Sequence, residues 1–426
     1  PPPPPFVTNF AQQRSGLGEW LDAGEYSATC GSAAYFYGPI PRALAATYFD
    51  SNKFNTSFAL CEFYSYNLAT QAWSDLTSVM GDGETTGPGC RAHASLVCFP
   101  DDNQLVVIGG VVPNENIFGE YIRHRTDMWS LNLVSMTWTQ IFPNCYDPHF
   151  TLRSRSATPK FVSTLPALCA SSGLPLDWLS DERFGGIYPG TAAVRASDPV
   201  LRSKGILVAA AWSHVLSIAD PLPTNLFDAV ADVYFFNLTA SPPVWQRLSF
   251  GSGTCPPTLG GSVVYSAPTA SLVFDGGYFL GEVASISVST TRGMTCVVAF
   301  SRSLTTGLVE TTSRMPIETS APQMHKLHTA GVALKDGRVL FAGGIGVGQH
   351  LNVMYRSSHM SAAGAHTSRT SYGLDVIFSP HDMSFSYLPE RPAAMRWRAG
   401  AVLIRFPDGN VLELGGAVVS SASAVT

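Results

Sequence analysis

The histidines and cysteines of this chain are the first residues to consider for metal or redox chemistry. His325 and His328 are three positions apart, and this spacing would not place both side chains on one side of an extended strand. The eight cysteines are scattered, without a Cys-x-x-Cys pair or a Cys/His cluster at zinc spacing. The sequence therefore predicts no metal site and no cofactor, and it predicts that the cysteines are ordinary buried thiols.

Sequence motifs of several common enzyme classes are absent from the chain. The chain has no G-x-S-x-G elbow, no phosphate-binding loop and no H-E-x-x-H pair. Residues 343–348 are rich in glycine, but they follow a strand-like run and precede no helix pattern, which counts against a dinucleotide site. A Ser/His/Asp triad stays open, because its members need not be close along the chain. We expect no catalytic residues and a protein that is not an enzyme.

The composition favours a folded protein with a large core. Hydrophobic residues make up 45% of the chain and charged residues only 13%, and the 38 glycines and 30 prolines indicate many turns. A net charge of −5 gives no general attraction for a phosphate backbone, so non-specific nucleic-acid binding is not expected. No run of 18 apolar residues is present, so neither a transmembrane helix nor a membrane partner is expected.

Two N-glycosylation sequons begin at Asn55 and Asn237. With an even cysteine count they keep a secreted protein open as an alternative. However, Asn237 lies in a repeat motif that gives it a structural explanation, and the N-terminus shows no signal-peptide pattern. The expectation is an intracellular protein, cytoplasmic or organellar.

An internal repeat indicates the elements that would position any functional residues. Three segments nearly coincide, and a fourth is weaker: EFYSYNL at 62–68, DMWSLNL at 127–133, DVYFFNL at 232–238 and DVIFSPH at 375–381. An aromatic residue follows each of them after a short turn: Trp73, Trp138, Trp245, and Phe385 or Tyr387 in the last. Each segment with its aromatic partner predicts two adjacent strands.

A second pattern lies upstream, where two strand-like runs flank a polar turn and end in paired glycines. It spans residues 91–110, 261–277, 328–344 and 398–416, with the pairs Gly109–Gly110, Gly276–Gly277, Gly343–Gly344 and Gly415–Gly416. Such turns are typical of β-hairpins, and glycine at a strand end lets neighbouring backbones approach closely. A hairpin followed by the two later strands makes a four-stranded antiparallel unit, which is a propeller blade.

These marks resemble the kelch-repeat family, in which a diglycine closes the second strand and a Tyr and a Trp follow at set spacing. The resemblance covers residues 20–426 and implies an all-β fold, a single kelch-type β-propeller over residues 21–426. Five blades fall within 21–390 and another begins at 396–416, so six blades are predicted, with five or seven left open. Residues 1–20 would be a Pro-rich arm, and closure is expected to join 417–426 with 6–20 in one sheet.

Some propellers that resemble this family are copper-radical oxidases similar to galactose oxidase. In those enzymes the metal-binding histidine directly follows an axial tyrosine, whereas here Leu327 precedes His328. A clear cysteine and tyrosine partner pair is also missing, so copper oxidation is kept as a remote alternative.

Long insertions are predicted to gather on one face of the propeller. Residues 39–60, 111–126, 143–189 and 345–372 all join second to third strands or successive blades, and 143–189 would hold a short helix near 176–183. Long loops of this kind are often functional. The candidate binding residues are the cationic and aromatic side chains of these insertions: Arg123, His124, Arg125, Arg153, Arg155, His350, Tyr355, Arg356 and Arg369.

The predicted function is that of a non-catalytic protein–protein interaction scaffold or adaptor, a propeller subunit of a multi-subunit complex. An RNA-associated subunit that uses the basic loop residues is the first alternative. The copper-radical oxidase is the second.

Overall fold

The structure of the protein is a computed structural model. The described residues are 27–39, 61–91, 94–113, 122–145, 169, 171, 190–209, 211–212, 229–230, 233–248, 262–276, 295–314, 326–327, 329–343, 345–346, 375–388, 398–406 and 408–418. Their regular elements are β-strands and three short 3-10 helices, η4 (Thr77–Val79), η5 (Pro100–Asp102) and η6 (Ala267–Thr269).

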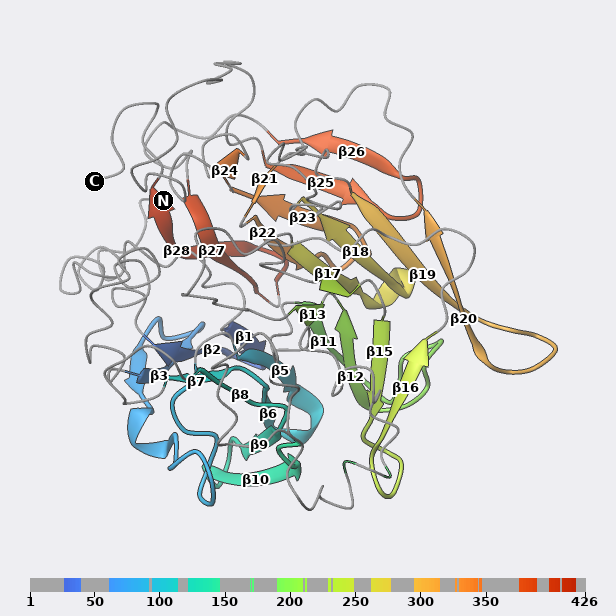
Figure 1. The fold of residues 1–426 in the computed structure, drawn as a ribbon. Coiled ribbons are helices and arrows are strands. Elements are labelled where there is room, and N and C mark those ends of the chain that lie inside the picture. Colours follow the sequence, from blue (N-terminus) through green and yellow to red (C-terminus); the bar gives the residue numbers. More distant parts are fainter. Residues whose placement is uncertain are drawn as a thin grey trace, which may run out of the picture.

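Five four-stranded antiparallel sheets follow one another along the described chain, and each is called a blade below (Figure 1). Blade 1 is β1 (Ser27–Cys30), β2 (Ala33–Pro39), β3 (Cys61–Asn67) and β4 (Trp73–Asp75). Blade 2 is β5 (Ser95–Phe99), β6 (Gln104–Ile108), β9 (Met128–Asn132) and β10 (Thr137–Phe142). Blade 3 is β11 (Gly190–Val194), β12 (Gly205–Ala209), β15 (Val233–Asn237) and β16 (Val244–Leu248). Blade 4 is β17 (Ser262–Ser266), β18 (Ser271–Asp275), β19 (Cys296–Arg302) and β20 (Val309–Arg314). Blade 5 is β22 (Ala330–Ala333), β23 (Val339–Ala342), β25 (Val376–Ser379) and β26 (Ser384–Tyr387).

Four two-stranded ladders complete the described sheets. They are β7 (Val111–Pro113) with β8 (Ile122–His124), β13 (Ala211–Trp212) with β14 (Ala229–Val230), β21 (Lys326–Leu327) with β24 (Ile345–Gly346), and β27 (Arg398–Arg405) with β28 (Val411–Val418).

The burial of each strand explains its sequence pattern. Second strands such as β12 and β23 are covered on both faces, so they are continuous apolar runs, and all of their residues are buried. Outer strands such as β10 and β20 have a mostly exposed face and alternate accordingly. The four predicted hairpins are all found, and so are the third and fourth strands of blades 1 to 5; in blade 4 these strands are β19 and β20.

The blades form a propeller arrangement through their first strands. β1 contacts β5, β5 contacts β11, β11 contacts β17, and β17 contacts β22. The last hairpin, β27–β28, lies between two blades: Ala401 and Leu403 pack with Ala330 of blade 5, whereas Val402 and Ile404 pack with Phe36 of blade 1. The structure therefore shows an all-β propeller arrangement with five described blades and one further hairpin.

The tryptophans of the outer strands pack between neighbouring sheets. The Trp138 ring of blade 2 lies 6.3 Å from Phe63 of blade 1 between ring centroids, and its indole Nε1 donates a hydrogen bond to the carbonyl of Val79 at 2.7 Å. Trp245 of blade 3 likewise lies 6.1 Å from Phe142 of blade 2. In blades 2 and 3 the tryptophan therefore covers the junction with the preceding blade.

The cysteines of the described residues are disulfide-bonded, so the prediction of ordinary buried thiols is wrong for them. Cys30 of β1 pairs with Cys98 of β5 across blades 1 and 2, and Cys145 pairs with Cys169. Cys90 and Cys296 are also disulfide-bonded, and no cysteine in the described part of the chain is free. Sequence spacing could not show this pairing, because Cys30 and Cys98 are 68 residues apart and meet only when two blades pack together.

The expected closure of the ring needs one correction. Strand β28 continues through Gly415 and Gly416 to Val418 and pairs with β27 over that length, so residues 417–418 extend the second strand and do not begin a third. Residues 6–20, expected to supply the closing strand, and 176–183, expected to be helical, lie outside the described residues.

Candidate functional site

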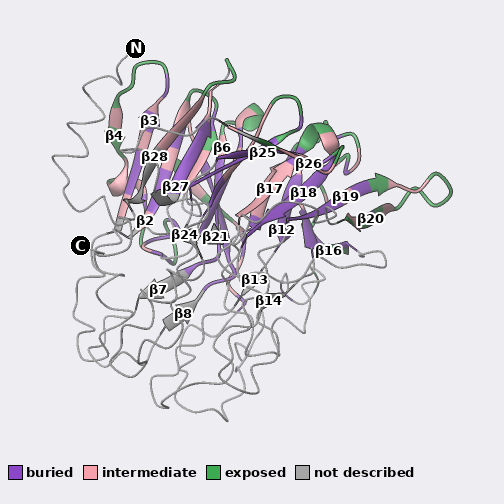
Figure 2. Cartoon of the chain, turned by 90° about the horizontal axis from the view of Figure 1, so that it is seen from above, coloured by how far each residue is buried: buried purple, intermediate pink, exposed green. Residues whose placement is uncertain are grey.

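The candidate site is the end of the blades at which each second strand ends and each third strand begins, called the loop face below. Three short ladders extend the sheets at this end: β7–β8 continues β6 and β9, β13–β14 continues β12 and β15, and β21–β24 precedes β22 and follows β23. Figure 2 shows β7–β8 and β13–β14 on the same side of the blades. This is the end at which the long insertions were predicted to emerge.

Glycines redirect the chain where the second strands reach the loop face. Between β6 and β7, Gly109 and Gly110 have φ angles of 61° and 94°, a left-handed backbone that other residues adopt only with strain. Gly276 and Gly343 have φ angles of 71° and 67° at the matching positions of blades 4 and 5. Gly109–Gly110, Gly276 and Gly343 therefore serve as bends that turn the strands out of the blades, with β7 directly after the first of them.

A buried ion pair lies beneath the first of these bends. Arg91, which is 0% exposed, binds the Asp127 carboxylate with both of its terminal nitrogens, at 2.7 and 2.6 Å. The same guanidinium donates to the carbonyl of Gly109 at 3.1 Å and, through Nε, to the carbonyl of Pro88 at 2.7 Å. Arg91 therefore joins the connection between blades 1 and 2, the glycine bend and the start of β9.

Two aromatic side chains complete this buried polar cluster. The Trp129 indole donates to the second Asp127 oxygen at 2.7 Å, and the Tyr37 hydroxyl donates to the carbonyl of Gly89. Burial raises the pKa of Tyr37, the nearby Arg91 charge opposes that rise, and the Asp127 charge adds to it. The phenol is therefore neutral, and every charge at this point is compensated.

Other blades bury a polar side chain at the position that corresponds to Asp127. In blade 4 this position is Thr295, which donates a hydrogen bond to Asp275 at 2.7 Å. In blade 5 it is Asp375, which is 6% exposed. This role was not predicted from the sequence, although Arg91 and Asp127 stand at the first position of the hairpin and third-strand motifs.

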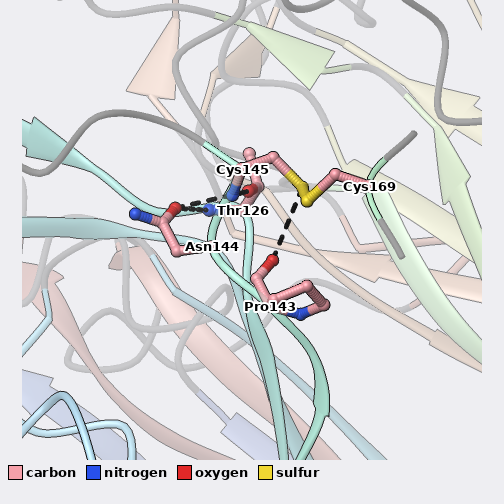
Figure 3. Close-up of a disulfide and its surroundings, with 5 residues drawn as sticks. All are labelled: Thr126, Pro143, Asn144, Cys145 and Cys169. Carbon is pink, nitrogen blue, oxygen red and sulfur yellow. Dashed lines mark hydrogen bonds between the residues drawn. A yellow bond between two sulfur atoms is a disulfide. The ribbon is translucent and has the colours of Figure 1, made fainter. Parts of the chain in front are cut away.

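A disulfide anchors the insertion that begins at residue 143 (Figure 3). Cys145 lies three residues after the end of β10 and pairs with Cys169, and both are fully buried among residues of blades 2 and 3. The backbone N–H of Cys145 donates to the Thr126 hydroxyl at 2.8 Å, and the backbone N–H of Thr126 donates to the Asn144 side chain at 3.1 Å. Two predicted insertions, 111–126 and 143–189, are thus joined at their bases on the loop face.

The connection between blades 1 and 2 is a glycine-rich loop over residues 80–90 on the same face. The Asp82 carboxylate accepts hydrogen bonds from the Thr85 hydroxyl and from the backbone N–H groups of Glu84, Thr85 and Thr86. The bond from the Thr85 hydroxyl, and then those from the backbone, lower the pKa of Asp82. At Gly89, a Cβ would lie 2.6 Å from the Gly83 backbone, so the outgoing and returning segments of the loop are in contact there. The loop therefore presents a fixed, exposed tip at Asp82–Thr86.

The predicted binding residues are described only in part. The backbones of Arg123 and His124 lie in β8. Arg125 is 7% exposed, and its backbone N–H donates to the Gly110 carbonyl at 2.9 Å, so its side chain is packed into the protein at the base of the insertion. The other six lie outside the described residues: Arg153, Arg155, His350, Tyr355, Arg356 and Arg369.

Metal-binding clusters and membrane-spanning helices are both absent from the described residues. Among them, no group of three or more His, Cys, Asp and Glu side chains could hold a metal ion. No helix that they form is long and apolar enough to cross a membrane. His325 and His328 lie outside the described residues.

Comparison with known proteins yields similarities to solved structures. No protein-family model matches the chain. A structure of YjhT aligns over 94% of this chain and 92% of its own, with 12% sequence identity and a TM-score of 0.48. A cryo-EM structure of RAG in complex with one melted RSS and one unmelted RSS aligns over 91% of this chain and 88% of its own, with 9% identity and a TM-score of 0.43.

Proposed function

We propose that this protein is a non-catalytic interaction scaffold whose loop face binds other proteins within a multi-subunit complex. The observation that carries the proposal is the anchoring of the insertions at that face. A binding loop loses less conformational entropy on association when its base is already fixed. The bases of the insertions at 111–126 and 143–189 are fixed by a strand ladder, a buried ion pair and a disulfide.

A six-bladed ring is part of this proposal. β27 contacts both β22 of blade 5 and β1 of blade 1. Trp73 of blade 1 packs against the cluster that holds Val402 and Ile404 of β27, as Trp138 and Trp245 pack on the blades that precede theirs. This parallel supports β27–β28 as the inner half of a sixth blade.

The test is a comparison of co-purifying proteins between loop variants of the full chain. In the first variant, residues 114–121 are replaced by Asn-Gly, which retains the β7–β8 ladder as a tight hairpin. In the matched control, residues 303–308 at the tip of the β19–β20 hairpin, on the opposite end of the blades, are replaced in the same way. Each protein is purified from native extract, and its partners are quantified by mass spectrometry.

The proposal predicts a defined set of partners that the 114–121 variant loses and the 303–308 variant keeps. It fails if the unaltered protein is recovered as a free monomer, or if the two variants retain the same partners. The alternatives are tested in the same samples: an RNA subunit would release its RNA steeply as salt rises, and an oxidase would contain stoichiometric copper.

A further inference from the structure

Asn237 stands at the end of β15 in a sequon, Asn237-Leu238-Thr239, that the proposed function does not use. Its side-chain oxygen accepts the backbone N–H of Thr239 at 2.9 Å and the Thr239 hydroxyl at 2.7 Å. Asn237 is partly exposed and Thr239 is exposed. The hydroxyl and the amide that define a sequon are thus in direct contact on an accessible turn.

The corresponding turns of blades 1 and 2 show that the asparagine has a structural role there without a sequon. Asn132 accepts the backbone N–H groups of Val134 and Ser135 at 2.9 and 3.0 Å, and Asn67 accepts those of Ala69 and Thr70, both at 2.9 Å. The residue two positions after the asparagine is Val134 or Ala69 in these turns. In these two turns the asparagine therefore acts without a threonine, and the Thr239 hydroxyl is an addition found in blade 3.

The cysteines supply a second, independent observation. Cys30–Cys98 and Cys145–Cys169 are disulfides, Cys90 and Cys296 are also oxidised, and no cysteine of the described residues is free. Disulfides form and persist in oxidising compartments and are rare where thiols are kept reduced. Enzymatic N-glycosylation takes place in the same secretory environment. These disulfides favour that environment over the intracellular compartment predicted from the sequence, a prediction that stays untested.

We infer that Asn237 is an N-glycosylation site, modified in the oxidising compartment in which the disulfides form. The co-reactant is an oligosaccharide carried on a lipid diphosphate. The Asn237 amide nitrogen forms a bond to the anomeric carbon of the sugar while the bond from that carbon to the diphosphate oxygen breaks. The diphosphate leaves with the electron pair, and the amide nitrogen gives up one proton.

The position of Asn237 keeps a glycan away from the loop face. β15 begins at Val233, at the loop face, and runs to Asn237 at the opposite end of blade 3, where it pairs with Val244 across the turn into β16. A glycan there would cover the short turns of the propeller and leave the long insertions free. Glycosylation and the proposed binding of partners therefore occupy opposite ends of the molecule.

The first experiment analyses the full-length protein purified from its natural source. Enzymatic removal of N-glycans in heavy-oxygen water converts a glycosylated asparagine into an aspartate that carries the isotope, and peptide mass spectrometry locates it. We expect the label at residue 237, read separately from the sequon at Asn55. Recovery of the Asn237 peptide as unmodified asparagine in untreated protein would overturn the inference.

Variants of the full chain, made in secretory eukaryotic cells, separate the sequon from its structural turn. Thr239→Val should abolish the glycan at residue 237, whereas Thr239→Ser should retain it. Val134→Thr should create a new sequon in the matching turn of blade 2, since Val134 is 78% exposed. An unchanged mobility in both Thr239→Val and Val134→Thr proteins, with normal secretion, would contradict accessibility at these turns.

Discussion

The buried Arg91–Asp127 pair allows a sharp test of what holds the loop face. In Arg91→Met, the Asp127 carboxylate keeps only the Trp129 indole among the donors described above, and the carbonyls of Pro88 and Gly109 lose their donor. Removing one partner of a buried ion pair costs about 3–5 kcal/mol of unfolding free energy, because an uncompensated charge remains. We expect a loss of that size for Arg91→Met and a similar one for Asp127→Leu.

The double variant distinguishes the ion pair from general damage to the core. Arg91→Met with Asp127→Leu removes both charges and leaves unpaired only neutral groups, each of which costs about 1–3 kcal/mol. The double variant should therefore be about 2–3 kcal/mol more stable than the sum of the single losses implies. Arg338→Met is the control, because its pair with Asp336 at 2.6 Å is about half exposed and contributes about 0.2–1 kcal/mol.

The assay is equilibrium unfolding in urea without reductant, followed by tryptophan fluorescence and circular dichroism, with equal m-values as the check on compactness. Two results would refute the reasoning. One is a loss below about 1 kcal/mol for Arg91→Met, the size expected of an exposed pair. The other is additivity in the double variant.

Three further predictions concern stability. Serine replacement of both Cys30 and Cys98, which are 68 residues apart, should lower the unfolding free energy by about 4 kcal/mol, and replacement of both Cys145 and Cys169, which are 24 apart, by about 3 kcal/mol. The first loss is larger because a disulfide that closes a longer loop restricts the unfolded chain more. Urea unfolding of the two double variants measures both losses, and equal or reversed losses would contradict this cause. Burial, opposed by Arg91 and reinforced by Asp127, raises the pKa of Tyr37 above its ordinary value of 10.0, so the unfolded chain loses this proton first, and stability should fall by about 1.4 kcal/mol per pH unit above about pH 10. Tyr37→Phe should show a shallower decline in alkaline denaturation, and an unchanged slope would rule out Tyr37 as its source. Gly89→Ala should destabilise the protein more than Gly307→Ala. Both glycines have left-handed φ angles, which cost alanine about 1–2 kcal/mol, but a Cβ at Gly89 would also lie 2.6 Å from the Gly83 backbone, whereas one at Gly307 meets nothing within 4 Å. Thermal unfolding measures both variants, and equal decreases in Tm would contradict this reasoning.

Periodicity and turn chemistry made the blades predictable from sequence. The motifs at 127–133 and 232–238 become β9 and β15, and the aromatic positions of the last copy become β26, where the Phe385 ring is tilted against Phe378 with the ring centroids 4.8 Å apart. Local patterns suffice here because each strand pairs with a neighbour close in the chain.

Features that depend on contacts between residues far apart in the chain could not be read from the sequence. The disulfide partners, the Arg91–Asp127 pair and the base of the insertion at 111–126 arise where residues far apart in the chain meet. Strand β28 shows a different limit: Gly415 and Gly416 match the glycine pair that ends β6, yet β28 continues through them because β27 pairs with it up to Val418. The same dipeptide is a bend or part of a strand according to its partner.

The Cys30–Cys98 bond has a consequence for the order in which this chain can be assembled. Blade 1 packs on its other side against β27–β28, nearly the whole chain away in sequence. During synthesis the first blade therefore has no partner on that side until the last hairpin emerges, whereas Cys98 becomes available early. Oxidation of Cys30 and Cys98 would attach blade 1 to blade 2 and leave the side that faces β27–β28 available until that hairpin is synthesised. The disulfide would thus fix blade 1 in the protein before its noncovalent contact with β27–β28, which only the completed chain can make, is able to form.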